Sequence, residues 1–499
     1  MEHKNKLRAT ASCEGGRVHT ESLVNRFSNL PLEVAHHILS FLDIEELTRF
    51  SCGSKGCREL SLSSPSLNFC FSSVDTSTCE LRVKLLNTLD RFLFHRRDNK
   101  IQSFYLFWDG HYIEEGNYEP CYLCSNENFR IITWIHNAVR CNVEVLCLDI
   151  LLCDFEDEGL AFPCCVFLST SLRSLNVVQM KGIIIKTPPF AFSSNLSCLE
   201  LGELDIEDEA FFKWISCSCK CIKQLTVAGV RNIKSIAIES PSLERFNFYD
   251  PYGSQICHLK ISGEKLESIR IDWGFFLSGD HSLNIFAPNL IFLRWVGNVM
   301  NHPNLGELEC LEEAYIFLDP KVDEFENVFE ALCSVRRVGV LGINEATVKA
   351  LYREGSIPAQ FDDIWCLTLN TQSISDDLVP SMVSLLRGMP NLCTLHIKND
   401  SLIYARKSDD VQVQVQVQAS GFDMEYWKLQ NLDFIYQLEE VTIKLTEGSN
   451  GIEFARYILE HAEALEEMNI IYSPKQSDVI KKLNESKIIS DATLTFQEK

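Results

Sequence analysis

Apolar residues recur along most of the chain in a six-residue pattern, L-x-x-L-x-L, in which Ile, Val, Phe or Met can replace Leu. Between Leu172 and Val335 consecutive copies start 21 to 26 residues apart, a narrower spread than unrelated apolar segments would give. Self-similarity at such a period is typical of repeat architectures. Copies start at Val143, Leu172, Leu196, Ile222, Leu243, Leu266, Leu290, Leu311, Val335, Ile364, Leu392, Leu438 and Leu465, with a poorer copy at Ile101.

Each copy predicts one short β-strand, because apolar side chains alternate with polar ones along it. The residues between copies must return the chain to the start of the next strand, as a helix or an irregular loop. Segments 208–215 and 322–332 have the composition of such helices. Stacked units share one core and one curved parallel sheet, so we expect an α/β solenoid of leucine-rich repeats rather than one large unrelated α/β domain.

An insertion interrupts the repeats between Leu392 and Leu438. It contains the sequence VQVQVQVQ at 411–418, a strict two-residue alternation that favours a strand. The apolar face of this strand is uniform, so its pairing register is weakly specified. We interpret the segment as a hairpin or loop excursion, with an edge for strand addition as the alternative.

A different pattern precedes the repeats, in LPLEVAHHILSFLDIEELTRF from Leu30 to Phe50. Its apolar positions follow the period of a helix and predict two short helices. Asp43 and Glu46 have the spacing of a capping box at the start of the second helix. A third short helix is expected from Ser54. About forty residues rarely make a stable core alone, so this apolar face must pack on the repeats or on a partner.

The composition narrows the range of partners. The formal net charge is −23 and the isoelectric point is about 5.0, which argues against nucleic acid and anionic membranes as partners. No apolar signal segment is visible near the N-terminus. The most apolar run, residues 143–155, is too short to span a bilayer and carries charges. We therefore expect a cytoplasmic or nuclear protein, or one found in both compartments.

The 21 cysteines form two clusters that resemble metal ligands. Cys121 and Cys124 form a single CxxC, and no second CxxC follows them. Cys217, Cys219 and Cys221 alternate, which on a strand would place them on one face. A structural zinc site needs four converging ligands, so small buried hydrophobes are the favoured interpretation. We expect reduced thiols, no metal and no cofactor.

Sequence signatures of catalysis are also missing. There is no phosphate-binding GxxxxGK[ST], no dinucleotide-binding GxGxxG, no HExxH and no GxSxG. DFEDEG at 154–159 begins like a calcium loop, but its twelfth position is Cys165 instead of Glu. The chain is therefore predicted to be non-catalytic, with no catalytic residue.

Two segments carry a family resemblance. LPLEVAHHILSFLDIEELTRFS, followed by Ser54-Lys55, resembles the F-box, a three-helix module that docks substrate receptors onto the adaptor of SCF-type cullin–RING ubiquitin ligases. Residues 438–470 resemble the FBD region of plant F-box/leucine-rich-repeat proteins. One departure is Cys57, where the family usually has Trp. The organisation expected from this resemblance is a disordered segment (1–24), the F-box (25–70), the solenoid (71–400), the insertion (401–420), an FBD-like α/β block (421–475) and a C-terminal tail (476–499).

The resemblance implies an adaptor partner and, through it, a cullin–RING ligase. The chain would then be the substrate-recognition subunit, with the repeats binding an unknown protein substrate. The alternative is that the same apolar side chains cap the first repeats. The residues expected to contact the adaptor are Leu30, Pro31, Val34, Ile38, Leu39, Leu42 and Leu47.

The repeats suggest where a substrate would bind. The residue between the last two apolar positions of each copy faces the concave side, and this row includes Asn247, Arg270, Arg294, Tyr315, Gly339, Thr368 and His396, with Phe292 and Arg337 beside it. We single out Arg270, Phe292, Arg294, Tyr315 and Arg337 as a patch for an acidic or phosphorylated segment, since guanidinium forks match carboxylate and phosphate. Ordinary solvated strand positions are the alternative. Two other functions stay open, a repeat scaffold with a degenerate F-box and a small-ligand sensor.

Overall fold

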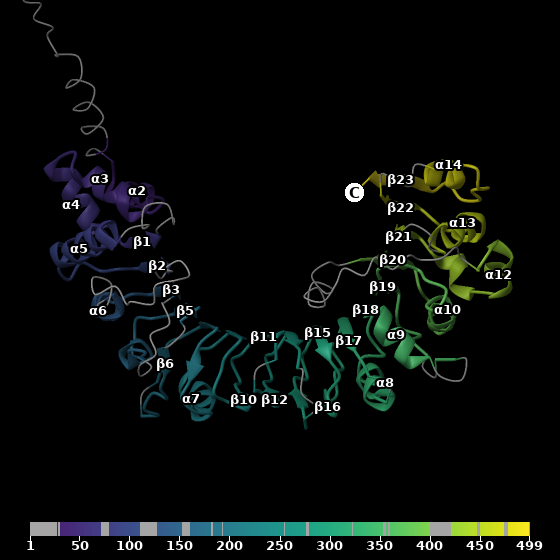
Figure 1. Cartoon of the computed structure of the whole chain (residues 1–499), viewed down its shortest axis with the longest axis horizontal. Coiled ribbons are helices and arrows are strands. Elements are labelled where there is room, and N and C mark those ends of the chain that lie inside the picture. Colours follow the sequence, from purple (N-terminus) through teal and green to yellow (C-terminus); the bar gives the residue numbers. More distant parts are fainter. Residues whose placement is uncertain are drawn as a thin grey trace, which may run out of the picture. The chain divides into compact units, whose positions relative to one another are not determined.

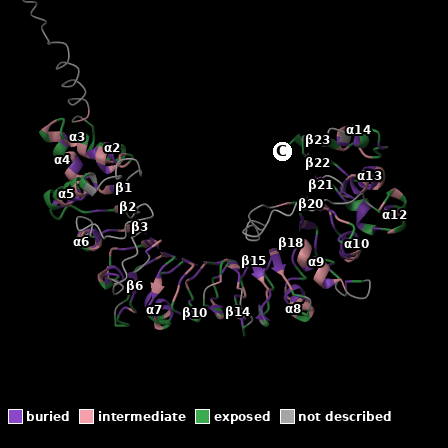
Figure 2. Ribbon diagram, in the orientation of Figure 1, coloured by how far each residue is buried: buried purple, intermediate pink, exposed green. Residues whose placement is uncertain are grey.

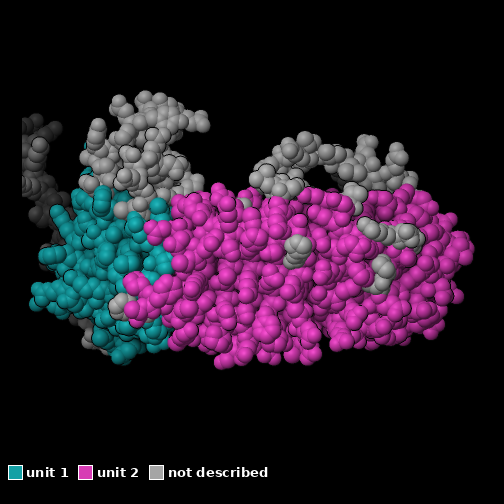
Figure 3. Space-filling view, turned by 90° about the horizontal axis from the view of Figure 1, so that it is seen from below, with its two compact units in different colours: residues 1–188, 192–200 teal, residues 189–191, 201–499 magenta. Residues whose placement is uncertain are grey.

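The computed structural model describes residue 27 and residues 30–498, except for 71–78, 110–126, 152–159, 181–182, 192, 254, 276–278, 322, 353–355, 358–359, 400–420, 447–449 and 474–477. The chain forms two compact units (Figure 3). Unit 1 contains residues 1–188 and 192–200, and unit 2 contains residues 189–191 and 201–499.

Three short helices open unit 1: α2 (Leu32–Leu39), α3 (Ile44–Ser51) and α4 (Lys55–Ser63). The predicted capping box is confirmed, because Asp43 accepts a hydrogen bond from the Glu46 amide at 2.8 Å and Glu46 accepts one from the Asp43 amide at 3.4 Å. Ser54 caps α4 in the same way, by accepting from the Cys57 amide at 3.1 Å. Side chains satisfy backbone donors that a helix start leaves free, so these residues define where α3 and α4 begin.

The rest of unit 1 is a parallel sheet covered by helices. Strands β1 (Ser66–Cys70), β2 (Ser103–Asp109), β3 (Val145–Leu151) and β5 (Ser174–Val178) pair in this order. Buried rings of Phe69, Phe104, Trp108 and Trp134 pack edge to face beneath it. The other elements are α5 (Cys79–Arg96), α6 (Glu127–Arg140), β4 (Leu160–Ala161), η1 (Cys164–Val166), β6 (Ile183–Ile185) and β7 (Cys198–Gly202), which straddles the unit boundary.

Unit 2 contains a long parallel sheet with one strand per repeat, as the sequence period predicts. Alternate residues of many of its strands are buried, and the helices of this unit lie on one side of the sheet (Figures 1 and 2). The strands are β9 (Gln224–Ala228), β11 (Arg245–Asp250), β13 (Ser268–Trp273), β15 (Phe292–Asn298), β17 (Glu313–Asp319), β18 (Val340–Asn344), β19 (Cys366–Asn370), β20 (Thr394–Lys398), β21 (Glu440–Lys444), β22 (Glu467–Tyr472) and β23 (Thr493–Glu498).

Helices return the chain in many of the repeats of unit 2. The two returns predicted at 208–215 and 322–332 are confirmed as α7 (Ala210–Ser218) and α8 (Phe325–Ser334). The other helical elements are α9 (Glu345–Leu351), α10 (Val379–Arg387), α12 (Met424–Leu429), η3 (Asp433–Gln437), α13 (Gly451–His461) and α14 (Asp478–Asn484).

The shortest repeats use strands as returns, which the sequence interpretation did not include. A second parallel sheet pairs β10 (Ser235–Glu239), β12 (His258–Ser262), β14 (Ser282–Phe286) and β16 (His302–Asn304). A strand advances about 3.3 Å per residue, whereas a helix advances about 1.5 Å. Repeats of only 21 to 24 residues therefore cross the core with fewer residues when the return is extended. The short strand β8 (Asp205–Ile206) is not part of this second sheet, and its Asp205 forms an isolated parallel bridge with Arg231.

Two expectations need correction. The copy assigned to Val335 is out of register by three residues, because Tyr315 of β17 pairs with Gly342 and not with Gly339. The segment 476–499 was expected to be a tail, but it contains α14 and β23, and β23 pairs with β22 along six residues. One more repeat therefore ends the sheet.

Several predictions fall outside the described residues: the disordered segment 1–24, the VQ alternation at 411–418, the Cys121–Cys124 pair and the acidic turn at 154–159. The other cysteine cluster does not lie on a strand. Cys217 is in the last turn of α7, Cys219 is buried just after it, and Cys221 is exposed. Within the described part of the chain, no helix has the length and apolar character needed to cross a bilayer.

Candidate functional site

The first candidate surface is an apolar patch on and around α2. Pro31 is exposed, and the fractional exposure of the other members ranges from 36% for Leu30 to 73% for Phe41. Large apolar side chains clustered at this exposure typically mark an interaction surface. We call this patch the F-box face, which consists of Leu30, Pro31, Leu32, Val34, Ile38 and Phe41.

The seven predicted adaptor contacts fall into three classes of exposure. Leu30, Pro31, Val34 and Ile38 lie on the F-box face, and Leu42 is half-buried. Leu39 and Leu47 are only 1% and 2% exposed and belong to the internal core of the three helices, so they present almost no surface to a partner. Sequence periodicity finds the apolar stripe of a helix but cannot divide it between core and partner.

Leu32 and Phe41 belong to the F-box face but were not among the predicted contacts. Phe41 follows the end of α2, where helical periodicity no longer applies. Its ring packs edge-on against that of His37, with 5.0 Å between the ring centres.

Cys57, at the position of the missing aromatic residue, is 2% exposed and faces inward. A Trp there would have to enter the interior of the module, so Cys57 alters the core and leaves the F-box face unchanged.

The second candidate surface lies on the exposed side of the sheet in unit 2. Pairing of β13, β15 and β17 places Arg270, Arg294 and Tyr315 in one row. The Arg270 guanidinium lies 5.0 Å from the ring centre of Phe292, and that of Arg294 lies 5.5 Å from the ring centre of Phe317. We call these five residues the arginine–aromatic row.

The rings of the row contact one another as well. The ring centre of Tyr315 lies 5.7 Å from that of Phe292 and 6.1 Å from that of Phe317. Burial among these groups raises the pKa of the Tyr315 hydroxyl. Cation–π contacts hold each guanidinium against a ring and leave its N–H edges free to donate. Neither arginine forms an ion pair with a described residue, so both remain available to an anion.

Gly342 makes room for the Tyr315 ring. A Cβ atom at position 342 would lie 2.3 Å from Cδ1 of Tyr315, so any other residue would displace the ring. The sequence interpretation missed both Gly342 and Phe317. Extending the two-residue alternation of EAYIFLD by one step would have found Phe317, but the slip in register at β18 concealed Gly342.

Arg337 does not belong to the row. It lies in the turn between α8 and β18, exposed and unpaired with any strand. The same three-residue slip explains this difference, because the repeat copy at Val335 gave Arg337 the flanking position that Phe292 has in its own copy. Arg270, Phe292, Arg294 and Tyr315 are the predicted residues that the fold brings together.

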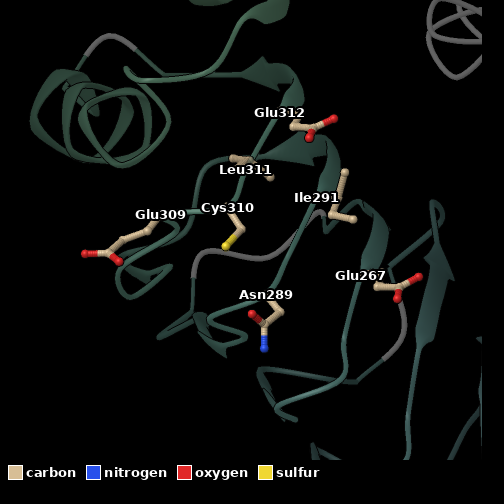
Figure 4. A pocket seen from close by; sticks show the side chains of 7 residues that line it. All are labelled: Glu267, Asn289, Ile291, Glu309, Cys310, Leu311 and Glu312. Atoms are coloured by element: carbon tan, nitrogen blue, oxygen red, sulfur yellow. The ribbon is translucent and has the colours of Figure 1, made fainter.

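The N-terminal edge of the same strands is acidic. A shallow hollow there is lined by Glu267, Glu309 and Glu312, together with Asn289, Ile291, Cys310 and Leu311 (Figure 4). Glu267 and Glu312 directly precede β13 and β17. A ligand that crosses from this edge to the middle of the strands therefore meets carboxylates first and guanidinium groups next.

Comparison with known proteins identifies the first surface. Residues 27–69 match the family model described as the F-box domain. This segment is an F-box domain. It includes α2, α3, α4 and most of β1, so the F-box face is the uncovered apolar surface of that domain.

Relatives extend the similarity beyond the F-box. Two putative F-box/FBD/LRR-repeat proteins of Arabidopsis thaliana are 22% and 24% identical to the chain. Each alignment covers 90% of this chain, with 89% and 92% of the relatives. A putative F-box/LRR-repeat protein of the same plant is 24% identical over 77% of this chain and 71% of its own. The chain is thus homologous to F-box/FBD/LRR-repeat proteins over most of its length, which confirms the resemblance.

Proposed function

We propose that the chain is a non-catalytic substrate-recognition subunit of an SCF-type cullin–RING ubiquitin ligase. The observation that carries this proposal is the F-box domain with its F-box face uncovered. Isolated exposed apolar residues are common, but a cluster of six around one short helix leaves considerable apolar area to be buried by a partner. F-box domains generally bind the SCF adaptor, and the F-box face is the surface that we assign to it.

The role of unit 2 would be to hold the substrate. We assign substrate binding to the arginine–aromatic row and expect an acidic or phosphorylated segment there. Two unpaired guanidinium groups, each held against a ring, can each donate to one phosphate or carboxylate. The acidic hollow at the strand edge favours a segment whose anionic residue is flanked by a basic one. In this function the chain performs no bond-making step and acts by raising the local concentration of substrate.

Co-purification with the SCF adaptor tests the first assignment. The variant Val34→Asp/Ile38→Asp places two charges on the F-box face without touching the internal core, because these side chains are 44% and 40% exposed. Phe94→Asp/Phe129→Asp is the matched control, since these residues are also exposed and lie in unit 1 outside the F-box.

We expect the adaptor to bind the wild type and the control but not the F-box variant. Circular dichroism must first establish that all three proteins are folded. Failure of the folded wild type to bind several adaptor variants would contradict the proposal and leave a repeat scaffold as the better description.

Binding to a phosphopeptide library tests the second assignment. Arg270→Glu/Arg294→Glu reverses two charges on the row, whereas Lys234→Glu/Lys260→Glu makes the same charge change at exposed residues associated with β10 and β12 of the other sheet. We expect the first variant to lose phosphopeptide binding and the second to keep it. Equal binding by both variants would contradict the role of the row, whatever the outcome of the adaptor experiment.

A further inference from the structure

A concentration of positive charge in unit 1 has no role in the function proposed above. A cavity of about 810 Å³ lies between α3, α4 and α5. Five basic side chains line it: Arg58, Arg91, His95, Arg96 and Arg97. Glu59 is the single acid among the described residues that line it, although acids outnumber basic residues by 69 to 46 in the whole chain. We call this cavity the basic pocket.

Arg96 is the buried member of the basic pocket, with a relative exposure of 0%. Its Nη1 donates to the Ser64 carbonyl at 2.5 Å, and its Nη2 donates to the Lys100 carbonyl at 2.8 Å. Its Nε is buried without a hydrogen-bond partner, and no described carboxylate pairs with the guanidinium. A buried charge is costly unless it is paired, so this cation lacks its expected counter-charge.

Other properties of Arg96 agree with a missing anion. Burial lowers the pKa of its guanidinium to about 10, and no acidic side chain of Asp or Glu acts against that effect. The pKa of His36, on the neighbouring helix α2, is lowered by burial and also by the positive charge of Arg96. The positive charge of Arg96 therefore also acts on His36, a side chain that does not line the basic pocket.

The remaining arginines are free to bind a ligand. Arg58, Arg91 and Arg97 are exposed, and none forms an ion pair or side-chain hydrogen bond with a described residue. Arg58 comes from α4, and Arg91 comes from α5. Several cations that repel one another are held around one hollow, which is the arrangement that binds a multiply charged anion.

We propose that the basic pocket binds a small soluble molecule that carries two or more phosphoryl groups. Guanidinium forks match phosphate oxygens in pairs, and the exposed Arg58 of α4 and Arg91 of α5 can each take one phosphoryl group, while the buried Arg96 adds positive charge to the pocket. The cavity volume falls within the ordinary range for small-molecule sites. The bound ligand would link the third helix of the F-box to α5.

Pyrophosphate is the probe for the first test, with the full-length chain. Isothermal titration at constant ionic strength compares the wild type with Arg58→Gln/Arg91→Gln and with the control Lys84→Gln/Lys260→Gln. The control removes two exposed positive charges outside the pocket. We expect the dissociation constant to rise at least tenfold for each pocket arginine removed, which corresponds to about 1.4 kcal/mol per arginine, and to stay unchanged in the control.

Hydrogen exchange gives an independent measurement. Pyrophosphate should slow exchange in peptides of α4 and α5 in the wild type and in the control, but not in the pocket variant. If the double variant does not fold, Arg58→Gln and Arg91→Gln are titrated singly, each with the same tenfold expectation.

Four results would overturn the proposal. The first is no binding of pyrophosphate to the wild type at millimolar concentration, and the second is equal binding to the pocket variant. The third is equal or tighter binding of citrate, which would assign the pocket to carboxylates instead of phosphates. The fourth is tighter association with phosphoinositide vesicles than with pyrophosphate, which would reassign it from a soluble ligand to a lipid headgroup. None of these outcomes depends on adaptor binding.

Discussion

Substitution of two nearby residues of the F-box, Leu39 and Phe41, can test folding and partner binding separately. Phe41 is 73% exposed and Leu39 is 1% exposed, although both are large apolar side chains two positions apart. Truncation of each to alanine should therefore give opposite results. Phe41→Ala should weaken adaptor binding and leave the fold intact, whereas Leu39→Ala should weaken the fold.

The exposed fractions set the expected magnitudes. Full burial of a phenylalanine side chain contributes up to about 3 kcal/mol. Because roughly 0.7 of Phe41 remains to be buried, its loss should cost about 2 kcal/mol of binding, or a rise of about thirtyfold in the dissociation constant. Leu39→Ala should cost about 2 to 5 kcal/mol of local stability, because it leaves a cavity in the core.

Two assays measure these effects separately. Titration of the adaptor gives the binding free energy. Hydrogen exchange of peptides from α2, α3 and α4 gives the local unfolding free energy, which suits a chain of two units better than a single global transition. Exchange should accelerate about thirtyfold or more in Leu39→Ala and stay within about 0.5 kcal/mol of wild type in Phe41→Ala.

The control for specificity is Phe129→Ala, an exposed apolar residue of unit 1 outside the F-box. Accelerated exchange in Phe41→Ala, with adaptor affinity unchanged, would refute the division of the F-box into a core and an uncovered face. It would mean that Phe41 packs against other parts of the chain in solution.

Three further predictions concern other contacts. Glu127 is buried and accepts hydrogen bonds from Arg82 at 2.5 and 2.9 Å. Glu127→Gln should therefore lower the unfolding free energy of unit 1, measured by urea titration, by about 3 to 5 kcal/mol. Replacement of both residues by Met should lower that free energy by less. Burial and a nearby arginine lower the pKa of His36, so the unfolded chain binds the proton more strongly and the F-box should lose stability as the pH falls below about 6.5. His36→Gln should flatten that dependence in urea titrations at pH 7.5 and 5.5. Gly342→Ala should displace the Tyr315 ring and weaken phosphopeptide binding about tenfold, and an unchanged affinity would exclude the ring from the binding surface.

The repeat architecture could be predicted because the sequence repeats one physical requirement. Each strand must bury alternate side chains, so the apolar pattern fixes both its position and the face that it buries. The prediction failed at β18, where VRRVGV and VGVLGI both fit the pattern and only pairing with β17 distinguishes them. A three-residue slip preserves the apolar spacing but changes which residues share a row.

Other parts of the fold depend on contacts that a single sequence does not reveal. Strand returns such as β12 resemble loops in the sequence, because their pairing partners come from neighbouring repeats. Leu39 is buried and Val34 is exposed because only one side of α2 packs against α3 and α4, and the sequence of α2 does not show which side that is. The basic pocket draws its arginines from two helices that are distant in sequence, so no local motif could indicate it.

The register of the sheet fixes the distance between successive members of the arginine–aromatic row. Arg270 and Arg294 are paired positions on adjacent strands, so their backbones are about 4.8 Å apart. An extended peptide advances about 3.4 Å per residue, so a peptide lying across the strands cannot place successive residues on successive repeats. The spacing of the strands therefore differs from the spacing of residues along an extended peptide. A substrate bound as proposed above would place one anionic residue between two arginines, because a continuous acidic run would lose its alignment with the row after a few residues.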